Sequence, residues 1–311
     1  MTRVIWKNRQ LLNESEAHIS IYDSAMIFGD CVFEMTRSFK GAQFKLVDHL
    51  ERLYRSARYL RINIPYTLSE LEQACYETQD CNEFEPDDEH RLMINVTRGL
   101  LSIYKNTGKP GPNVIISDFP LRWTTAGMGK LFDTGINAVI PSQRAIPAEL
   151  LEPKVKNRSR IHYLMANIEA GQMKGDNNWP LMLDPDGFIA ECPGANFVIV
   201  KGGKLYTPEG RNVLRGISLS YVNWLVMEGM IEKNLELYDV MDADEAFVTG
   251  TPFCMLPVTS INGVHIGDGK VGPKFNSILN VWGEMVGVGI KSQIQAWDRG
   301  RVEGETPYQF K

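Results

Sequence analysis

Residues 183–208, LDPDGFIAECPGANFVIVKGGKLYTP, carry the densest structural signal in the chain. The runs NFVIV and KLYTP are short and apolar, which is typical of buried strands. Asp-Pro-Asp-Gly and Lys-Gly-Gly-Lys follow LMLD and NFVIV, and such clusters of Gly, Pro and Asp favour tight turns. We therefore predict three successive strands here, LMLD, NFVIV and KLYTP.

The segments on either side of this stretch predict further strands and helices. Upstream, we expect a strand near residues 135–140 and a helix over about 159–174. Downstream, we expect a helix over about 218–228, a strand at 246–250 and a last helix at 273–286. The tail after Trp297 is polar, so we expect it to be loosely ordered.

The N-terminal third predicts a separate α+β domain. Apolar runs predict strands at residues 2–6, 17–22, 31–39, 43–46, 91–97 and 113–117. Helical spacing predicts a helix through LVDHLERLYRSARYLRI with Asp48 as its cap, and a second over 67–78 with Thr67 as its cap. We expect a small domain at residues 1–120, a linker at 121–129 and a larger domain at 130–311.

Composition narrows the class of protein. The 311 residues are 43% hydrophobic and 23% charged, with a net charge of −5, which is typical of a globular chain and disfavours a nucleic-acid partner. The five cysteines are scattered and form no CxxC pair, which disfavours disulfides and zinc and favours a reducing compartment. Neither a secretory leader nor a long apolar run is visible, so we expect a cytoplasmic protein without a membrane partner.

Lys156 is the first candidate for chemistry. It lies at a predicted strand-to-helix boundary in EPKVKNRSRIHY, with Arg158 and Arg160 close by. Neighbouring cations and desolvation lower the pKa of an amine, which a lysine acting as nucleophile or base requires. The alternative is a solvated surface lysine, because most lysines are exposed, and Lys154 is a rival two residues away.

Three further segments contain candidate binding groups. Glu191 lies among apolar and small residues, where a carboxylate could pair with a cationic ligand nitrogen, or simply face solvent in a turn. Gly216-Ile217-Ser218 opens a predicted helix, whose free N–H groups suit a phosphate, although a plain serine cap is commoner. Thr249, Gly250 and Thr251 leave a strand together and could also bind phosphate, or form an ordinary turn.

The order of these motifs resembles the fold type IV enzymes that use pyridoxal 5'-phosphate (PLP), the branched-chain and D-amino-acid aminotransferase family. The resemblance covers nearly the whole chain and rests on FGDCVFEMTRSFKG, HLERLYRSARYLRI, LDPDGFIAECPGANFVIVKGGKLYTP, LRGIS, TGTPFCMLPV and INGVHIGDGKVGP. It implies a two-domain α+β fold, with a small N-terminal domain and a larger C-terminal domain built on a barrel-like sheet. It also implies a homodimer.

The resemblance assigns roles to the cofactor-binding candidates. Arg52 would bind the cofactor phosphate, and Glu191 would pair with the pyridine nitrogen. Leu214 would pack on the cofactor ring. The remaining phosphate contacts would come from Ile217, Ser218, Gly250 and Thr251.

The resemblance also places the reactive lysine by counting. In the D-amino-acid enzymes this lysine precedes a helical Glu-Ala pair by 13 residues, and here that position, counted back from Glu169, is Lys156. The position of a tyrosine that contacts the phenolate oxygen in branched-chain enzymes is occupied by Arg160, to which we assign that contact. The substrate side is expected to include Phe33, Arg37 and Arg98.

The function expected from these residues is a transaminase acting on apolar, branched-chain-like amino acids with a 2-oxo acid as partner. In VTRGLLSIYK the positions of the D-amino-acid carboxylate trap are Ile103 and Lys105, which puts D-specificity in doubt. The alternatives are a D-amino-acid or (R)-amine transaminase, a lyase of the aminodeoxychorismate type, and a non-catalytic binding protein with the same fold. A nicotinamide dehydrogenase is disfavoured because no GxGxxG follows an early strand.

Overall fold

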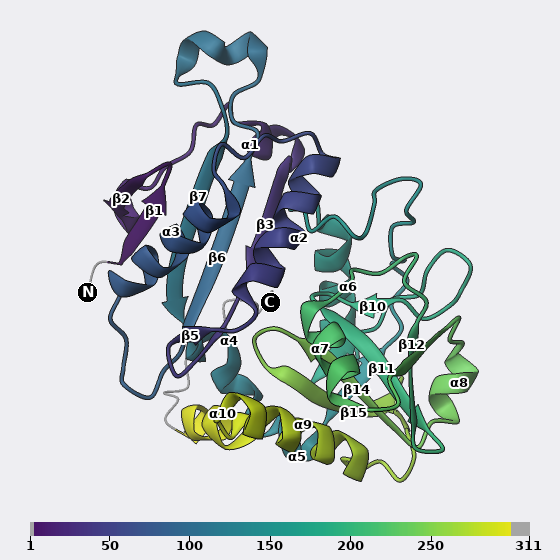
Figure 1. Ribbon diagram of the computed structural model, residues 1–311. Helices are drawn as coiled ribbons and strands as arrows, with labels where there is room; N and C mark the ends of the chain where they lie inside the picture. Colours follow the sequence, from purple (N-terminus) through teal and green to yellow (C-terminus); the bar gives the residue numbers. More distant parts are fainter. Residues whose placement is uncertain (1–2, 300–311) are drawn as a thin grey trace. The chain divides into compact units, whose positions relative to one another are not determined.

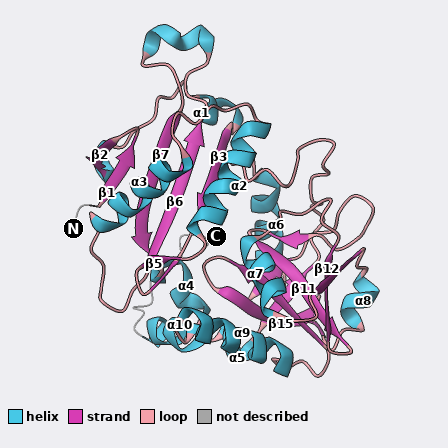
Figure 2. Ribbon diagram, in the orientation of Figure 1, coloured by secondary structure: helices cyan, strands magenta, loops and turns pink. Residues whose placement is uncertain are grey.

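The computed structural model describes residues 3–299, and contacts within the chain divide them into two compact units. The N-terminal unit runs to Trp123 and also includes Val155–Arg160, whereas the C-terminal unit comprises Thr124–Lys154 and the residues from Ile161 onward. Each unit combines helices and strands (Figure 2), which confirms the expected two-domain α+β class. The separate placement of Val155–Arg160 differs from the uninterrupted domain at 130–311 that we expected.

The N-terminal unit is built on an antiparallel sheet with strand order β2-β1-β7-β6-β3. Its strands are β1 (Val4–Lys7), β2 (Gln10–Asn13), β3 (Cys31–Met35), β6 (His90–Thr97) and β7 (Asn113–Pro120), beside a small hairpin of β4 (Ser38–Phe39) and β5 (Ala42–Gln43). Its helices are η1 (Glu14–Glu16), α1 (Ser24–Phe28), α2 (Leu46–Tyr59), α3 (Leu68–Asp80) and η2 (Ser102–Thr107). Figure 1 shows α2 and α3 lying against the sheet.

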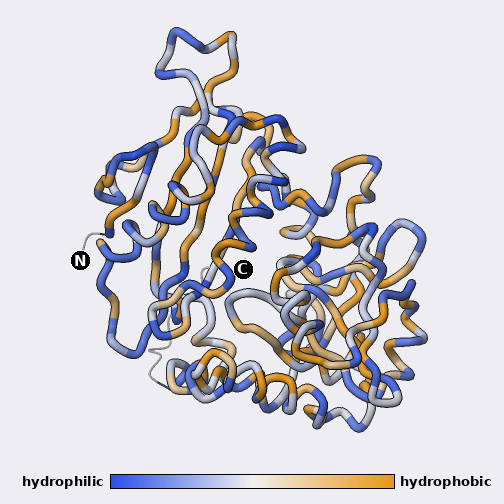
Figure 3. Tube along the Cα trace, viewed as in Figure 1, coloured by the Kyte–Doolittle hydropathy of each residue, from blue (hydrophilic) through white to orange (hydrophobic). Residues whose placement is uncertain are grey.

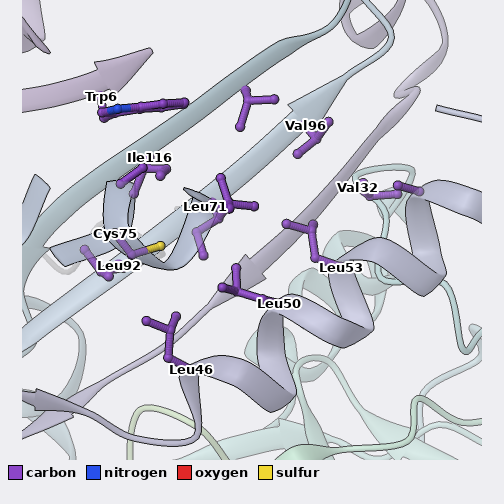
Figure 4. Close-up of a cluster of buried hydrophobic side chains, with 14 of the residues drawn as sticks. Trp6, Val32, Leu46, Leu50, Leu53, Leu71, Cys75, Leu92, Val96 and Ile116 are labelled. Atoms are coloured by element: carbon purple, nitrogen blue, oxygen red, sulfur yellow. The ribbon is translucent and has the colours of Figure 1, made fainter. Parts of the chain in front are cut away.

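The core of this unit lies between α2, α3 and the sheet. Helix α2 presents Leu46, Leu50, Leu53 and Ala57, whose spacing places them on one side of a helix, and all four are buried. Alternate residues of the strands belong to the same buried cluster: Val32, Leu92, Ile94, Val96, Val114 and Ile116. Figure 4 labels Val32, Leu92, Val96 and Ile116 among them. Each such buried side chain contributes about 1.5–3 kcal/mol by leaving water. In Figure 3, which has the same view as Figure 1, the strands of this sheet include hydrophobic stretches drawn in orange.

Of the two predicted helix caps, Thr67 is confirmed and Asp48 is wrong. Thr67 caps α3 as predicted, because its hydroxyl accepts the N–H of Glu70 and the Glu70 carboxylate accepts the Thr67 N–H. Asp48 is not the cap of α2: the helix begins at Leu46, after Lys45 in the left-handed region at φ 54°. Leu46 is buried with the rest of the apolar stripe, so its burial extends the helix toward its N-terminus.

The C-terminal unit is built on a nine-stranded mixed sheet, with main order β13-β12-β11-β14-β15-β8-β9 and with β10 and β16 added at β11 and β15. Its strands are β8 (Ile136–Val139), β9 (Asn178–Pro180), β10 (Glu191–Cys192), β11 (Ala195–Lys201), β12 (Lys204–Pro208), β13 (Met230–Lys233), β14 (Glu245–Gly250), β15 (Cys254–Ile261) and β16 (Val264–His265). Its helices are η3 (Ala126–Met128), α5 (Leu131–Thr134), α6 (Ile161–Gln172), α7 (Ile217–Leu225), α8 (Leu237–Met241), α9 (Pro273–Val286) and α10 (Ile290–Arg299), while α4 (Arg122–Thr125) crosses the unit boundary.

Strands β11, β14 and β15 are buried over nearly their whole length, which explains why NFVIV reads as a continuous apolar run. The predicted strands at NFVIV, KLYTP and 246–250 are confirmed, as is the helix at 273–286. The strand at 135–140 and the helices near 159–174 and 218–228 are also confirmed, with shifted ends.

Four predictions of secondary structure are wrong. Residues 17–22 are not a strand, because they lead without a ladder partner into α1, where Asp23 accepts the N–H of Ala25. LMLD is not a strand either: Leu183 makes only isolated bridges, and the Asp184 carboxylate accepts N–H groups of the following turn. The strand at 43–46 ends at Gln43, where the chain turns into α2.

The fourth wrong prediction is that the helix at 273–286 is the last one. Helix α10 follows it and buries Ile290, Ile294 and Trp297, whose spacing of four and three residues is that of an amphipathic helix. The predicted loose tail beyond this helix, at residues 300–311, lies outside the described residues. From residue 3 to residue 299, no helix has the length and apolar character that crossing a bilayer requires.

Candidate active site

Lys156 is fixed by its backbone at the edge of the N-terminal sheet. Its carbonyl accepts the N–H of Phe33 on β3 at 3.0 Å, and its own N–H donates to Ser56 Oγ on α2 at 3.3 Å. Asn157 forms an antiparallel bridge with Val32. The segment that contains Lys156 therefore extends the sheet beyond β3, and both the sheet and α2 hold the lysine in place.

Three cationic side chains surround the buried ring of Phe33. The Nζ of Lys156 lies 4.9 Å from the ring centroid, and the guanidinium carbons of Arg158 and Arg160 lie at 3.7 and 5.0 Å. Arg158 is also held by two hydrogen bonds to Asn95 Oδ1, at 3.1 and 2.7 Å. Asn95 stands opposite Phe33 in the β3–β6 register, so both side chains lie on one face of the sheet. Positive charge beside an amine favours its neutral form, which is the nucleophilic one.

On β3 and α2, a buried acid joins a histidine and an arginine. Glu34 accepts from Arg52 through Nε at 2.6 Å and a terminal nitrogen at 2.8 Å, and His49 Nδ1 lies 2.8 Å from the second carboxylate oxygen. All three side chains are nearly inaccessible to solvent. Among residues 3–299, the buried Nε2 of His49 has no hydrogen-bond partner.

This arrangement shifts the protonation of Glu34 and His49. Burial on its own would raise the pKa of Glu34, but the charge and hydrogen bonds of Arg52, with a smaller contribution from His49, hold that pKa well below its usual range. Burial lowers the pKa of His49; Glu34 opposes this change, while the charges of Arg52 and Lys156 add to it. The trio therefore consists of an ionised acid, a guanidinium and a neutral imidazole.

The two arginines expected on the substrate side both have protein partners. Arg37 follows the end of β3 and is fully buried, with its guanidinium carbon 3.9 Å from the Phe39 ring centroid and its Nε donating to Ser38 O. Arg98 donates to both carboxylate oxygens of Asp30, at 2.5 and 3.2 Å. It also donates to the carbonyl oxygen of Leu60, the residue that follows α2. These contacts give both residues a part in holding the N-terminal unit together.

In the C-terminal unit, Glu191 is a buried carboxylate held by hydrogen bonds from three residues. The hydroxyl of Tyr163 donates to Oε1 at 2.6 Å, and Oε2 accepts the Leu214 N–H at 3.0 Å and Asn196 Nδ2 at 3.2 Å. Asn196 Nδ2 also donates to Leu214 O at 2.8 Å. Hydrogen bonds to a carboxylate favour its charged form, so this acid is prepared to face a cationic group.

A tight turn creates the contact between Glu191 and Asn196. Pro193-Gly194 joins β10 to β11, and Gly194 has φ 86°, which a type II turn requires at its third residue. The turn makes Glu191 and Asn196 cross-strand partners, so their side chains share a face. Gly216 must lack a side chain, because a Cβ there would lie 2.0 Å from Asn196 Oδ1.

The two expected phosphate-binding segments flank this carboxylate network. Helix α7 begins at Ile217 after Gly216, which carries no side-chain cap, and Ser218 is buried in its first turn. Its first N–H groups face the helix N-terminus, where backbone dipoles favour an anion. Strand β14 ends at Gly250, before Thr251, and its Thr249 is the register partner of Asn196. The C-terminal unit therefore brings together the predicted residues Glu191, Leu214, Ile217, Ser218, Gly250 and Thr251.

The rival lysine has a different environment. The amine of Lys154 forms an ion pair with Glu152 at 3.0 Å and donates to Arg211 O at 2.9 Å. The Lys154 amine is thus held by an acid and a carbonyl oxygen, whereas the Lys156 amine lies over the Phe33 ring. This difference supports the choice of Lys156.

Sequence reasoning missed four polar residues that complete these two groups: Glu34, His49, Tyr163 and Asn196. Asn196 could have been found, because a Pro-Gly turn two residues after Glu191 makes the residue five positions later its strand partner. The other three carry no local signal. Over residues 3–299 no cluster of His, Cys, Asp and Glu side chains is arranged to hold a metal ion.

Comparison with known proteins identifies similar chains over almost the full length. A family model for amino-transferase class IV matches residues 31–261. A Methanocaldococcus jannaschii protein, whose assignment as a branched-chain-amino-acid aminotransferase is provisional, is 34% identical over 90% of this chain and 97% of its own. A D-alanine aminotransferase of Listeria monocytogenes is 28% identical over 86% of this chain and 90% of its own.

Solved structures show the same likeness. The T.th. branched-chain amino acid aminotransferase, solved with pyridoxamine 5'-phosphate, superposes with a TM-score of 0.82 at 27% identity. The match covers 96% of this chain and 98% of that one.

Proposed function

We propose that this chain, which belongs to the class IV aminotransferases and is a PLP-dependent transaminase, moves the amino group of apolar, branched-chain-like amino acids to a 2-oxo acid. The observation that carries the proposal is the position of the Lys156 amine, next to Phe33 and beside two guanidinium groups. Guanidinium charge near an amine favours its neutral form, which the chemistry of this family requires.

The residues of the N-terminal unit fit the cofactor. Lys156 is the proposed covalent attachment, and Arg52 the proposed partner of the phosphate. His49 contributes a buried nitrogen without a partner among the described residues, next to the same Glu34 carboxylate that orients Arg52. A buried polar atom left unsatisfied is costly, so a site of this kind is completed by a polar ligand. Arg160 remains our candidate for the phenolate oxygen.

The residues of the C-terminal unit fit the rest of the cofactor. Glu191 is the proposed partner of the pyridine nitrogen, and hydrogen bonds from Tyr163, Asn196 and Leu214 favour the ionised form that this role needs. Leu214 is proposed to contact the ring. Phosphate contacts are assigned to Ile217, Ser218, Gly250 and Thr251, on the free N–H groups of α7 and the end of β14.

The residues of this chain move protons and orient the reactants. Bound PLP supplies an electron sink that stabilises negative charge at the substrate α-carbon. With the cofactor bound, Lys156 would be the group that moves the proton: its Nζ would accept the proton from the α-carbon of the amino donor and would return one to the α-carbon of the new amino acid in the second half-reaction. Phe33 orients the lysine, because Phe33 packs against it and its N–H holds the Lys156 carbonyl. Arg52 and Ser218 are proposed to hold the cofactor phosphate, and they make no bond to the reacting carbon.

The apolar substrate preference rests on the face of the sheet next to Lys156. Phe33 and Met35 alternate along β3, and Met93 stands opposite Met35, so all three side chains lie on one face. We assign Phe33 to the substrate pocket. Arg37 and Arg98 remain proposed residues of the substrate side. Because both make hydrogen bonds within the protein, we propose that they act by positioning the residues they contact.

A second candidate is a D-amino-acid transaminase, favoured by the likeness to the Listeria enzyme. Reconstituted protein should be titrated with L-leucine, D-alanine and (R)-1-phenylethylamine while cofactor absorbance is followed. We expect conversion to the pyridoxamine form with L-leucine and slower or no conversion with the others. Conversion by D-alanine alone would replace the leading proposal with the second. Repeated release of pyruvate from aminodeoxychorismate without an amino acceptor, and without conversion to the pyridoxamine form, would identify a lyase.

Lys156→Ala tests the assignment of the lysine, with Lys154→Ala as the matched control. We expect Lys156→Ala to lose both the yellow chromophore and turnover, and Lys154→Ala to keep both, because the Lys154 amine is paired with Glu152. Retained colour in Lys156→Ala contradicts the assignment. Likewise, an Arg160→Ala protein with an unchanged cofactor spectrum contradicts a contact of Arg160 with the phenolate oxygen.

We also propose a homodimer in a reducing, cytoplasmic compartment. Helix α1 and the turn before it expose large apolar side chains, Ile21, Met26 and Phe28, each more than 60% accessible. Such a patch is typical of a surface that a second chain covers. All five cysteines are free, which fits a reducing compartment. Sedimentation analysis should give twice the mass of one chain. The Phe28→Asp substitution should lower the measured mass to that of one chain.

A further inference from the structure

The hydroxyl of Tyr163 makes the shortest of the three hydrogen bonds to Glu191 described above. It donates to Oε1 at 2.6 Å, whereas the two N–H donors act on Oε2. A hydrogen bond between a hydroxyl and a carboxylate at this distance is charge-assisted and among the stronger ones in proteins. Tyr163 therefore acts on a different carboxylate oxygen from Leu214 and Asn196.

Packing holds the Tyr163 hydroxyl in position. The residue lies in the first turn of α6, and its ring packs against a buried apolar cluster of Ala145, Ala166, Met182, Ala190 and Val213. The ring of His162 lies beside it, with centroids 4.2 Å apart. Met182 and Ala190 are joined by a backbone hydrogen bond just before Glu191, so the same cluster supports both the tyrosine and the acid. The hydrogen bond is thus preorganised by the core of the C-terminal unit.

We propose that Tyr163 is a positioning residue that keeps Glu191 ionised and thereby keeps the cofactor's pyridine nitrogen protonated. The inference rests on the proposed pairing of Glu191 with that nitrogen. When a proton is shared between a carboxylate and a pyridine, each donor to the carboxylate favours the state with the proton on nitrogen. Removing the donor moves the proton toward the carboxylate and weakens the electron sink.

The size of the effect follows from the type of bond. A hydrogen bond to a charged group is among those with the largest net contribution, and its loss changes a protonation equilibrium by about tenfold, or about 1.4 kcal/mol. We expect Tyr163→Phe to shift the proton from nitrogen to carboxylate by about this factor. The rate of α-proton removal should fall in parallel.

The test uses the full-length holoenzyme reconstituted with PLP labelled with nitrogen-15 at the ring. The nitrogen chemical shift distinguishes a protonated from an unprotonated pyridine without any need for turnover. In Tyr163→Phe we expect a shift toward the unprotonated value, and in Glu191→Gln a larger shift in the same direction. Tyr238→Phe, an exposed tyrosine on α8 of the same unit, is the matched control and should leave the signal unchanged.

The outcomes distinguish the role of Tyr163 from the pairing of Glu191 with the pyridine nitrogen. A shift in Glu191→Gln without one in Tyr163→Phe overturns the role of Tyr163 and leaves the pairing of Glu191 intact. No shift in either variant overturns the pairing itself. If Tyr163→Phe does not fold, site-specific 3-fluorotyrosine at position 163, a stronger donor, should move the signal toward the protonated value; an unchanged or opposite shift refutes the inference.

Discussion

Replacing Glu34 by glutamine should cost the N-terminal unit much of its stability. The Glu34 carboxylate accepts two hydrogen bonds from Arg52 and faces His49 Nδ1, and it is completely buried. Glutamine has the same shape but no charge, and its side-chain NH2 group would face a donor, such as an N–H group of Arg52, in place of an acceptor. The substitution therefore removes the negative charge of Glu34 from beside the buried Arg52 guanidinium.

The magnitude follows from the burial of both partners. The side chain of Arg52 is only 8% accessible, so solvent compensates little of the lost pairing. Breaking a buried ion pair by removing one partner costs about 3–5 kcal/mol. With a denaturant dependence of about 2 kcal/mol per M urea, the unfolding midpoint should fall by about 1.5–2.5 M.

Urea unfolding of the cofactor-free protein, followed by circular dichroism and by hydrogen exchange in peptides from α2, measures this loss. The control is Glu51→Gln on the same helix, where the ion pair to Arg55 is 3.4 Å long and more than half exposed on both sides. Exposed pairs contribute about 0–1 kcal/mol, so this variant should stay close to the parent protein. A midpoint for Glu34→Gln no lower than that of Glu51→Gln would refute the reasoning.

Three further outcomes can be checked by unfolding experiments. Burial lowers the pKa of His49, so the unfolded chain takes up a proton as the pH falls below about 6.5 while the folded state does not, and stability should decline there; His49→Gln should flatten that part of the profile. Gly99→Ala should destabilise the loop after β6 by about 2 kcal/mol or more, seen as faster proteolysis, since Gly99 has φ 86° and a Cβ would lie 1.7 Å from Gly111 O. Leu53→Ala should cost about 2–5 kcal/mol, whereas the half-exposed Val47 of the same helix should tolerate alanine within about 0.5 kcal/mol.

Patterns within a few residues carried most of the fold prediction. The spacing of Leu50, Leu53 and Ala57 predicted helix α2, and Thr67 as a cap predicted the start of α3. Where a local pattern was ambiguous, the prediction failed. LMLD is as apolar as a strand, yet Asp184 uses its carboxylate to close a turn, and β9 pairs with β8 in its place.

By itself, the sequence determined the class of fold and most of the strands and helices, and the resemblance to a family gave the candidates Lys156 and Glu191. Caps, turns and apolar periodicity act over one or two turns of chain, so they can be read in order along it. Only the tertiary structure decided which side chains those candidates meet. The Lys156 N–H reaches Ser56, 100 positions earlier, and Glu191 meets Tyr163, 28 positions earlier. Such contacts depend on where the whole chain packs, and no local propensity encodes them.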